Sequence, residues 1–219
     1  MRSLACKSTC VLVLAAFAVS ASTVVPATTQ GWIDSLGTDN GSSPFNNYFT
    51  GFCLSGCGLS GPAEFRNWFH FDVPALTGSV VSAQLEINAG TYDSPDASET
   101  FQATAIPSIF AFGDLGTGTV YGSRAFTAAD NAQNVLIDLD AAAVAAISGG
   151  NPFLVGGRLT TLSGQTSADE ALFATTGLQG LLIITTTEDL PEPAAWMLAA
   201  AGLLALVAFR RLGRARMRF

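Results

Sequence analysis

The sequence contains few side chains that could act as a catalytic base or nucleophile. His70 is the only histidine in 219 residues, and it alternates with Trp68 and Asp72 along an aromatic-rich run. Because residues i and i+2 share one face of a strand, Asp72 could orient His70 as a general base. No serine stands in a nucleophile-elbow context, and one histidine cannot form a multi-histidine metal site. We interpret His70 as a hydrogen-bonded residue on a sheet surface, and we predict no enzyme activity and no cofactor.

One turn-rich stretch, residues 91–100, gathers carboxylates that could bind a cation. Asp93, Asp96 and Glu99 lie close together there. Carboxylate oxygens suit Ca²⁺, but this ion wants about six to eight oxygen ligands, and the spacing is not that of an EF-hand. The three residues are therefore a weak calcium candidate, and a solvated loop between strands is the favoured interpretation.

Two cysteines stand close together in the middle of the chain. Cys53 and Cys57 form the sequence CLSGC, whereas Cys6 and Cys10 belong to the N-terminal segment. In an oxidising compartment a disulfide that closes this short loop is the favoured prediction. A zinc site is the alternative, but zinc wants four ligands and the chain offers one histidine.

Charge is distributed very unevenly along the chain. Between residues 22 and 190 there are 16 acidic residues against three arginines, Arg66, Arg124 and Arg158, which gives a formal net charge of −13. A surface of this sign repels nucleic-acid phosphate, so nucleic acid is excluded as a partner. The other seven basic residues lie at the two ends.

The N-terminal end has the order of a secretory signal peptide. Arg2 and Lys7 precede the apolar run 11–19, and small residues follow it. We predict a signal peptide over residues 1–21, cut by signal peptidase after Ala21. An uncleaved membrane anchor is the alternative, although the apolar run is short for the roughly 20 residues that cross a bilayer.

The C-terminal end has the pattern of a membrane anchor. Residues 194–209 carry no charge and are rich in Ala and Leu, so a transmembrane helix would satisfy their backbone in lipid. The positive-inside rule places the arginines that follow in the cytoplasm and the acidic domain outside. These topology-setting arginines are Arg210, Arg211, Arg214, Arg216 and Arg218.

Pro191-Glu192-Pro193 stands directly before this predicted helix, and residues 189–219 resemble the PEP-CTERM sorting signal. The tripeptide, the apolar helix and the arginine cluster occur in the order of that family. The resemblance implies recognition by an exosortase, a membrane-embedded processing enzyme of Gram-negative bacteria that typically also make exopolysaccharide. Cleavage near the tripeptide and outward release or transfer would follow. An ordinary single-span anchor is the alternative.

The middle of the chain predicts an all-β domain over residues 61–188 with one short helix. Residues 22–60, rich in Ser, Thr, Gly and Asn, predict a loosely structured leader that contains the disulfide loop. The helix is expected at 141–148, with Asp140 as its N-cap and Gly149 and Gly150 as its stop. Strands are expected at 65–73, 81–87, 100–106, 119–126, 134–139, 153–162, 171–175 and 178–187.

Short strands separated by turns favour a two-sheet antiparallel β-sandwich of jelly-roll type. Residues 66–187 also resemble a domain often found ahead of PEP-CTERM tails, and they are distantly similar in strand pattern to exported carbohydrate-binding-like jelly rolls. The stretches that carry this resemblance are FRNWFHFDVPALTGSVVSAQLEINAGTY, GTGTVYGSRAFTAAD and FLVGGRLTTL.

Three functions remain, in this order. The first is a non-catalytic surface or extracellular-matrix protein of the cell envelope, anchored in the inner membrane with its domain outside, then surface-bound or secreted, and associated with exopolysaccharide. The second is a carbohydrate-binding module, which needs exposed aromatic rings to stack on sugars. The third is a polysaccharide-acting enzyme, which needs two carboxylates about 5 to 10 Å apart in a cleft. The aromatic residues available for sugar stacking are Trp32, Trp68, Tyr48, Tyr92 and Tyr121.

Overall fold

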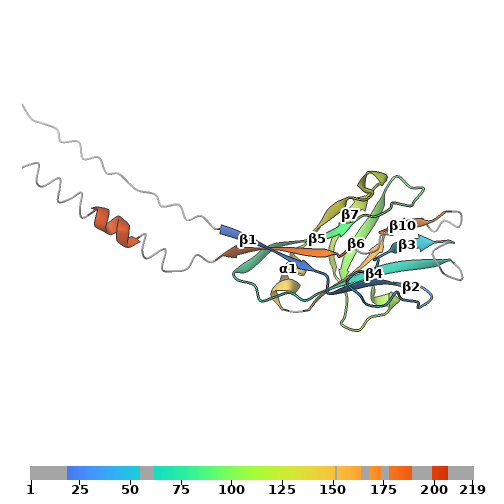
Figure 1. The fold of residues 1–219 in the computed structure, drawn as a ribbon, viewed down its shortest axis with the longest axis horizontal. Coiled ribbons are helices and arrows are strands. Elements are labelled where there is room, and N and C mark those ends of the chain that lie inside the picture. The colour runs from blue at the N-terminus through green and yellow to red at the C-terminus, as the bar shows by residue number, and fades with distance from the viewer. Residues whose placement is uncertain are drawn as a thin grey trace, which may run out of the picture. The chain divides into compact units, whose positions relative to one another are not determined.

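The strands form two antiparallel sheets in a computed structural model that describes residues 19–54, 62–150, 152–163, 168–173, 178–188 and 199–206 (Figure 1). The chain divides into two units, one of Ser20–Glu188 and one of Met1–Val19 with Asp189–Phe219. The sheets belong to the first unit, so its architecture is what positions any site there.

The smaller sheet has four strands whose alternation turns aliphatic side chains inward. Along the central strand, Ala83, Leu85 and Ile87 are buried, while the residues between them face outward. This is the expected pattern for a strand with one wet face. In spatial order the sheet contains β1 (Val19–Pro26), β11 (Leu181–Glu188), β5 (Ser79–Asn88) and β8 (Asn134–Leu139).

The larger sheet has seven strands and contributes mainly phenylalanines to the interior. Phe69, Phe101 and Phe153 are among its fully or almost fully buried side chains. β2 (Thr29–Asp34) pairs with β4 beside the main path of the sheet. The main path runs β10 (Glu170–Leu172), β3 (Thr50–Cys53), β4 (Ala63–Phe71), β9 (Phe153–Leu159), β6 (Glu99–Ala105) and β7 (Val120–Phe126).

One hydrophobic cluster joins the two sheets. Aromatic residues of the larger sheet and aliphatic residues such as Leu85, Ile137 and Leu182 of the smaller sheet belong to it together. Two antiparallel sheets that share one core, with little helix, are consistent with the predicted β-sandwich.

The described domain has one α-helix, and its sequence prediction is confirmed. Helix α1 spans Ala141–Ser148, and Asp140 caps it by accepting hydrogen bonds from the backbone N–H groups of Ala142 and Ala143 at 2.9 and 3.1 Å. Two 3₁₀ turns, η1 (Phe112–Asp114) and η2 (Ala128–Asp130), lie in the connections on either side of β7.

The prediction of a loosely structured leader is wrong, because β1, β2 and β3 all lie in residues 19–53. The polar composition of this stretch does not prevent pairing, since a buried side chain such as Gln30 finds hydrogen-bond partners. Gln30 is fully buried in β2, and its amide nitrogen donates to the carbonyls of Asn46 at 2.7 Å and Leu178 at 2.6 Å. Satisfied polar groups can be buried at little net cost, and composition alone does not reveal this.

Strands β1 and β11 lie side by side and antiparallel in the smaller sheet (Figure 1). The Ala27 N–H donates to the Gly180 carbonyl at 2.8 Å. Eight residues back from Ala27 is Val19, the start of β1, and eight residues on from Gly180 is Glu188, the end of β11. The first and last strands of the domain therefore reach the same end of it.

Residues 199–206 of the C-terminal segment are helical, inside the predicted transmembrane span 194–209. Among the residues that can be described, no helix has both the length and the apolar character needed to span a membrane. The rest of the predicted span lies outside them, so the transmembrane helix stays a prediction.

Tyr48 provides a prediction about alkaline stability. Its hydroxyl accepts from the Asn88 N–H at 3.0 Å, and burial raises its pKa to about 12 from the ordinary 10.0, against a lowering by the Asn88 backbone. Below pH 10 both the folded and the unfolded states keep the proton. Between about pH 10 and 12 the unfolded state loses it first, so the free energy of unfolding should fall by about 2–3 kcal/mol.

Urea denaturation between pH 8 and 12 measures this fall, and Tyr48→Phe should flatten it. At pH 8 the substitution Tyr48→Phe should lower the free energy of unfolding by about 1 kcal/mol, because the hydrogen bond to Asn88 is lost. If the free energy of unfolding of Tyr48→Phe falls with pH as steeply as that of the unchanged protein, other groups control alkaline unfolding.

Candidate functional site

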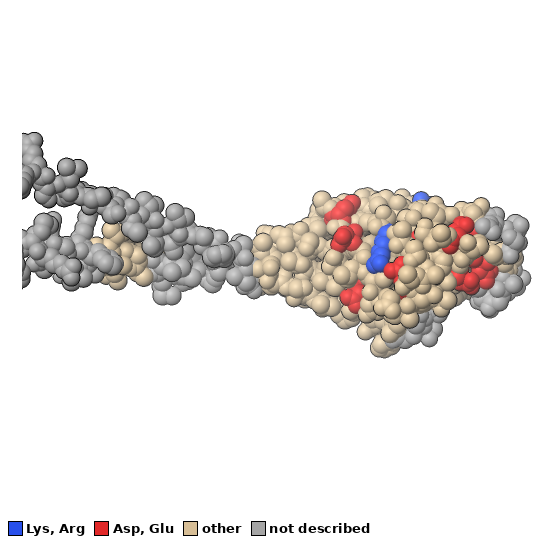
Figure 2. Space-filling model, turned by 90° about the horizontal axis from the view of Figure 1, so that it is seen from above, with Lys and Arg blue, Asp and Glu red and all other residues tan. Residues whose placement is uncertain are grey.

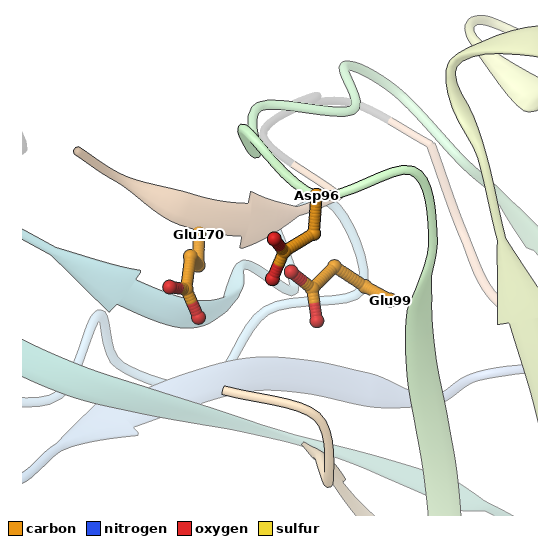
Figure 3. Close-up of side chains that lie close together, drawn as sticks. All are labelled: Asp96, Glu99 and Glu170. Atoms are coloured by element: carbon orange, nitrogen blue, oxygen red, sulfur yellow. The ribbon is translucent and has the colours of Figure 1, made fainter. Parts of the chain in front are cut away.

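Three carboxylates meet at one corner of the larger sheet (Figure 3). One oxygen from each of Asp96, Glu99 and Glu170 lies within 4.8 Å of the others. Glu99 and Glu170 are almost completely buried, and Asp96 is half-buried. Burying carboxylates is costly unless hydrogen bonds or opposite charges compensate, so this group is the most distinctive polar feature of the described chain.

Strand pairing brings Glu170 to residues far away in sequence. Glu170 begins β10, whose three residues pair with β3. On the other side, the backbones of Asp93 and Ala171 exchange hydrogen bonds of 3.0 and 2.7 Å. This bridge holds the loop that carries Asp96 next to Glu170.

Each oxygen of the two buried glutamates accepts one hydrogen bond. The Ser94 hydroxyl donates to one oxygen of Glu99 at 2.7 Å, and the Thr161 hydroxyl donates to the other. Glu170 accepts from the Ser163 N–H at 2.7 Å with one oxygen and from the Ser163 hydroxyl with the other. Glu99 therefore links Thr161 to the start of β6, and Glu170 links Ser163 to the start of β10.

Tyr92 lies beside the three carboxylates. Its hydroxyl donates to the Asp96 carbonyl at 2.6 Å. Partial burial raises the pKa of Tyr92, the hydrogen bond with Ser94 lowers it, and the negative charges of Glu99, Asp96 and Glu170 raise it further. The pKa of Tyr92 is therefore raised mainly by burial, and the neighbouring carboxylates act in the same direction.

The chemistry open to this group is limited. The ion pairs in the described part of the chain join Arg66 to Glu64, His70 to Asp72 and Arg124 to Asp130, and none involves the three grouped carboxylates. All four glutamate oxygens already accept hydrogen bonds, which is the arrangement of a structural polar network. Calcium, which would want about six to eight oxygen ligands, stays a prediction at this corner.

The sequence identified two of the three grouped residues. Asp96 and Glu99 lie in the predicted turn-rich stretch, but Asp93 is exposed and is not among the grouped carboxylates. Glu170 was missed because it lies about 70 residues further on in the sequence. Only the pairing of β10 with β3 and the bridge to Asp93 could have placed it here.

His70 does not form a catalytic pair with a nucleophile. Its Nε2 lies 3.4 Å from Asp72 Oδ1, so the two side chains share one face as strand alternation predicted, but this nitrogen makes no hydrogen bond, and the prediction of a hydrogen-bonded histidine is not met at Nε2. A hydroxyl is also present, that of Thr28, but it donates to Asp72 Oδ2 at 3.0 Å and not to the imidazole. A general base must reach the proton that it removes, so this order of groups does not activate Thr28.

The aromatic residues considered for sugar stacking do not form an exposed platform. Tyr48 is fully buried, and Trp68 and Tyr121 are each 7% exposed. Trp32 packs edge-on against Phe65 with 4.9 Å between ring centroids, and Trp32 and Tyr92 are both half-buried. The sugar-binding surface that the sequence allowed is therefore not assembled from these five side chains.

A cavity of about 600 Å³ lies away from the carboxylates. Residues 73–80, which connect β4 to β5, form one wall, and Ile147, Ser148 and Gly150 at the end of α1 form the other. No carboxylate, imidazole or thiol lines it. It therefore provides no general acid or base.

Several predicted residues lie partly or wholly outside the described chain. Cys53 is buried at the end of β3 and is disulfide-bonded, but Cys57 is outside the described residues, so their pairing stays a prediction. Pro191, Glu192, Pro193 and the five terminal arginines are also outside them.

Neither a protein-family model nor a curated protein matches this chain.

Proposed function

We propose that this chain is an exported, non-catalytic protein of the cell surface or extracellular matrix, with a jelly-roll-like domain delivered outward by a C-terminal sorting tail. Its partners are signal peptidase at the N-terminus, the membrane and an exosortase at the tail, and exopolysaccharide or the envelope at its destination. In this proposal the domain itself acts as a stable folded unit with a strongly negative net charge.

The observation that carries this proposal is the position of the two boundaries of the folded domain. The unit Ser20–Glu188 begins within two residues of the predicted signal-peptide cleavage and stops one residue before the predicted sorting tail. The predicted terminal signals therefore lie almost entirely outside the packed unit, with an overlap of residues 20 and 21. A domain bounded in this way can keep its core when both terminal segments are removed.

The side chains in the domain support a non-catalytic role. Among the described residues, no ionisable side chain lines the cavity, each oxygen of the buried glutamates accepts a hydrogen bond, and the Thr28 hydroxyl near His70 donates to Asp72. A predicted Cys53–Cys57 disulfide would further suit an oxidising, exported location.

The proposal is tested by the fate of the tail in the native host. The double change Pro191→Ala and Pro193→Ala should leave the protein in the inner-membrane fraction at its full C-terminal mass. The unchanged chain should appear at the surface or in the medium without roughly its last 30 residues. The reason is that the two prolines keep the processing segment extended, and a helix continuing through it would hide the backbone.

The matched control is Pro95→Ala with Pro107→Ala, two exposed prolines in loops of the domain. Intact mass and cell fractionation should show normal processing for this control. Release of the Pro191 and Pro193 variant with normal kinetics, or no change on deleting the exosortase, would contradict the proposal.

A further inference from the structure

Arg158 is the one arginine of the domain whose charge is not neutralised by a described carboxylate. Arg66 is paired with Glu64, and Arg124 is paired with Asp130. Arg158 forms no ion pair with a described residue, and its Nε is buried without a hydrogen-bond partner. The undescribed residues between 20 and 187 contain no Asp or Glu that could pair with it.

A loop holds the aliphatic part of Arg158 in place on the outer face of the larger sheet. Phe153 and Leu159 of the same strand belong to the core, and Arg158 points to the opposite face by alternation. An added Cβ on Gly116 would lie 2.4 Å from Arg158 Cδ, so the loop backbone lies directly against this side chain. The Gly116 N–H donates to the Thr104 hydroxyl at 3.1 Å, which fixes the contact. The guanidinium is therefore presented in a defined position.

Fold stability does not explain the guanidinium of Arg158. A buried N–H donor without an acceptor destabilises the folded state, and a shorter or apolar side chain would avoid that loss. Of the three guanidinium nitrogens, only Nε is fully buried without a partner, so the two Nη groups can reach solvent. Their four N–H donors are left for a ligand.

Polar side chains continue from Arg158 across the next two strands. Gln102 of β6 is the register partner of Arg158, and Ser123 of β7 is the register partner of Gln102. Within the described chain, neither of these two side chains takes part in a hydrogen bond. Paired positions share a face and neighbouring strands lie about 4.8 Å apart, so this row spans about 10 Å. The outer positions of β6, β7 and β9 include no carboxylate.

The charges next to this row compensate each other. Arg66 lies beside Arg158 on the same face, but it is committed to Glu64 and to the Leu115 carbonyl, to which its Nη1 donates at 2.8 Å. Asp114 accepts from a backbone N–H of its own turn and forms no ion pair with a described residue. Figure 2 shows one face of the domain, where acidic side chains are scattered and basic side chains are few. An anion at the row therefore meets a guanidinium without the strong negative charge of the domain as a whole.

We propose that Arg158, Gln102 and Ser123 form a binding site for a uronate unit of an acidic glycan. The two Nη groups donate to the two carboxylate oxygens of the sugar, in the fork geometry of arginine–carboxylate pairs. The amide of Gln102 and the hydroxyl of Ser123 bond to sugar hydroxyls along the row. An acidic peptide carries the same carboxylate, but a row of amide and hydroxyl groups matches a sugar better. The inference rests on the proposed association with exopolysaccharide and names the class of sugar that is recognised.

Isothermal titration calorimetry tests the inference on the chain purified from its native host in a neutral detergent, at low ionic strength. The probes are tetragalacturonate, its carboxyl-reduced tetramer and tetraglutamate. Arg158→Gln should weaken the binding of tetragalacturonate about 10- to 100-fold, because charge-assisted hydrogen bonds are lost. Arg158→Lys should restore only part of the affinity, since it keeps the charge without the fork.

The matched control is Arg124→Gln, which removes the same charge from a residue that pairs with Phe101 on the inner face. It should change the dissociation constant by less than about twofold, because distant surface charges are screened. If circular dichroism shows that Arg158→Gln misfolds, Gln102→Ala provides the test, with an expected loss of about 3- to 10-fold.

The inference fails if tetragalacturonate does not bind, if its carboxyl-reduced form binds as well, or if Arg158→Gln and Arg124→Gln weaken binding equally. Equal or tighter binding of tetraglutamate would assign the site to acidic peptides and would also overturn the inference. These results leave tail processing, the measured property for the proposed function, unaffected. Normal glycan binding by a chain whose tail is not processed would contradict the sorting proposal alone.

Discussion

Replacing Phe101 by alanine should lower the free energy of unfolding by about 3–5 kcal/mol, the largest loss expected of a single side-chain truncation here. Phe101 is completely buried at the centre of β6. Its ring contacts those of Phe126 and Phe173 edge-on, with centroids 6.4 and 5.3 Å away. It also covers Gly157, where an added Cβ would lie 2.2 Å from Phe101 Cζ.

Truncation would open a cavity bordered by a glycine and two rings, none of which can extend to fill it. Urea denaturation measures the loss. Phe45→Ala is the matched control, because Phe45 is 58% exposed and its loss should change stability by no more than about 0.5 kcal/mol. Equal effects of the two changes would mean that the core does not lie between the sheets as described.

Gly51→Ala should lower the free energy of unfolding by about 2–6 kcal/mol. The change combines backbone strain with overpacking, and each destabilises the fold by about 1–3 kcal/mol. Gly51 has φ of 128°, and an added Cβ would lie 2.1 Å from the Glu170 carbonyl oxygen. This oxygen belongs to the backbone of β10, which pairs with β3 at this point. The methyl group can only be accommodated if β10 moves away, and Glu170 would move with it.

Gly37→Ala separates the two contributions. Gly37 also has a positive φ, 88°, but nothing lies within 4 Å of an added Cβ. The free energy of unfolding of Gly37→Ala should therefore fall by only about 1–2 kcal/mol, which is the contribution of the backbone strain alone. Chemical denaturation gives both values, and hydrogen exchange should show loss of protection at β10 in Gly51→Ala alone. Similar losses for both variants would refute close packing of β10 on β3.

The elements that sequence analysis found are those whose pattern is local. Strand β8 and helix α1 lie where they were predicted, because Val135, Ile137 and Leu139 alternate and Asp140 is a good N-cap. β1 and β2 were not predicted, because Ser, Thr, Gly and Gln separate their few large apolar residues and leave no regular alternation. Their pairing depends on partners distant in sequence, such as the carbonyl of Leu178 that accepts from Gln30.

For the candidate site, too, the sequence predicts the local features but not the long-range ones. Two neighbouring acidic residues, Asp96 and Glu99, are visible as a cluster in the sequence, but their burial is not. Burial follows from hydroxyl donors supplied by Thr161 and Ser94 and from the arrival of Glu170 on another strand. Ser94 is close to Glu99 in sequence, but the contacts with Thr161 and Glu170 are long-range and have no local signature.

Under the proposed anchoring by the C-terminal tail, the position of β11 between β1 and β5 has a mechanical consequence. A pull applied through Glu188 acts along the axis of a strand that has a hydrogen-bonded neighbour on each side. The load is then shared by two ladders in shear, so that many bonds must yield at once instead of opening one by one from an end. Had the last strand been at the edge of its sheet, a single ladder would carry the same force.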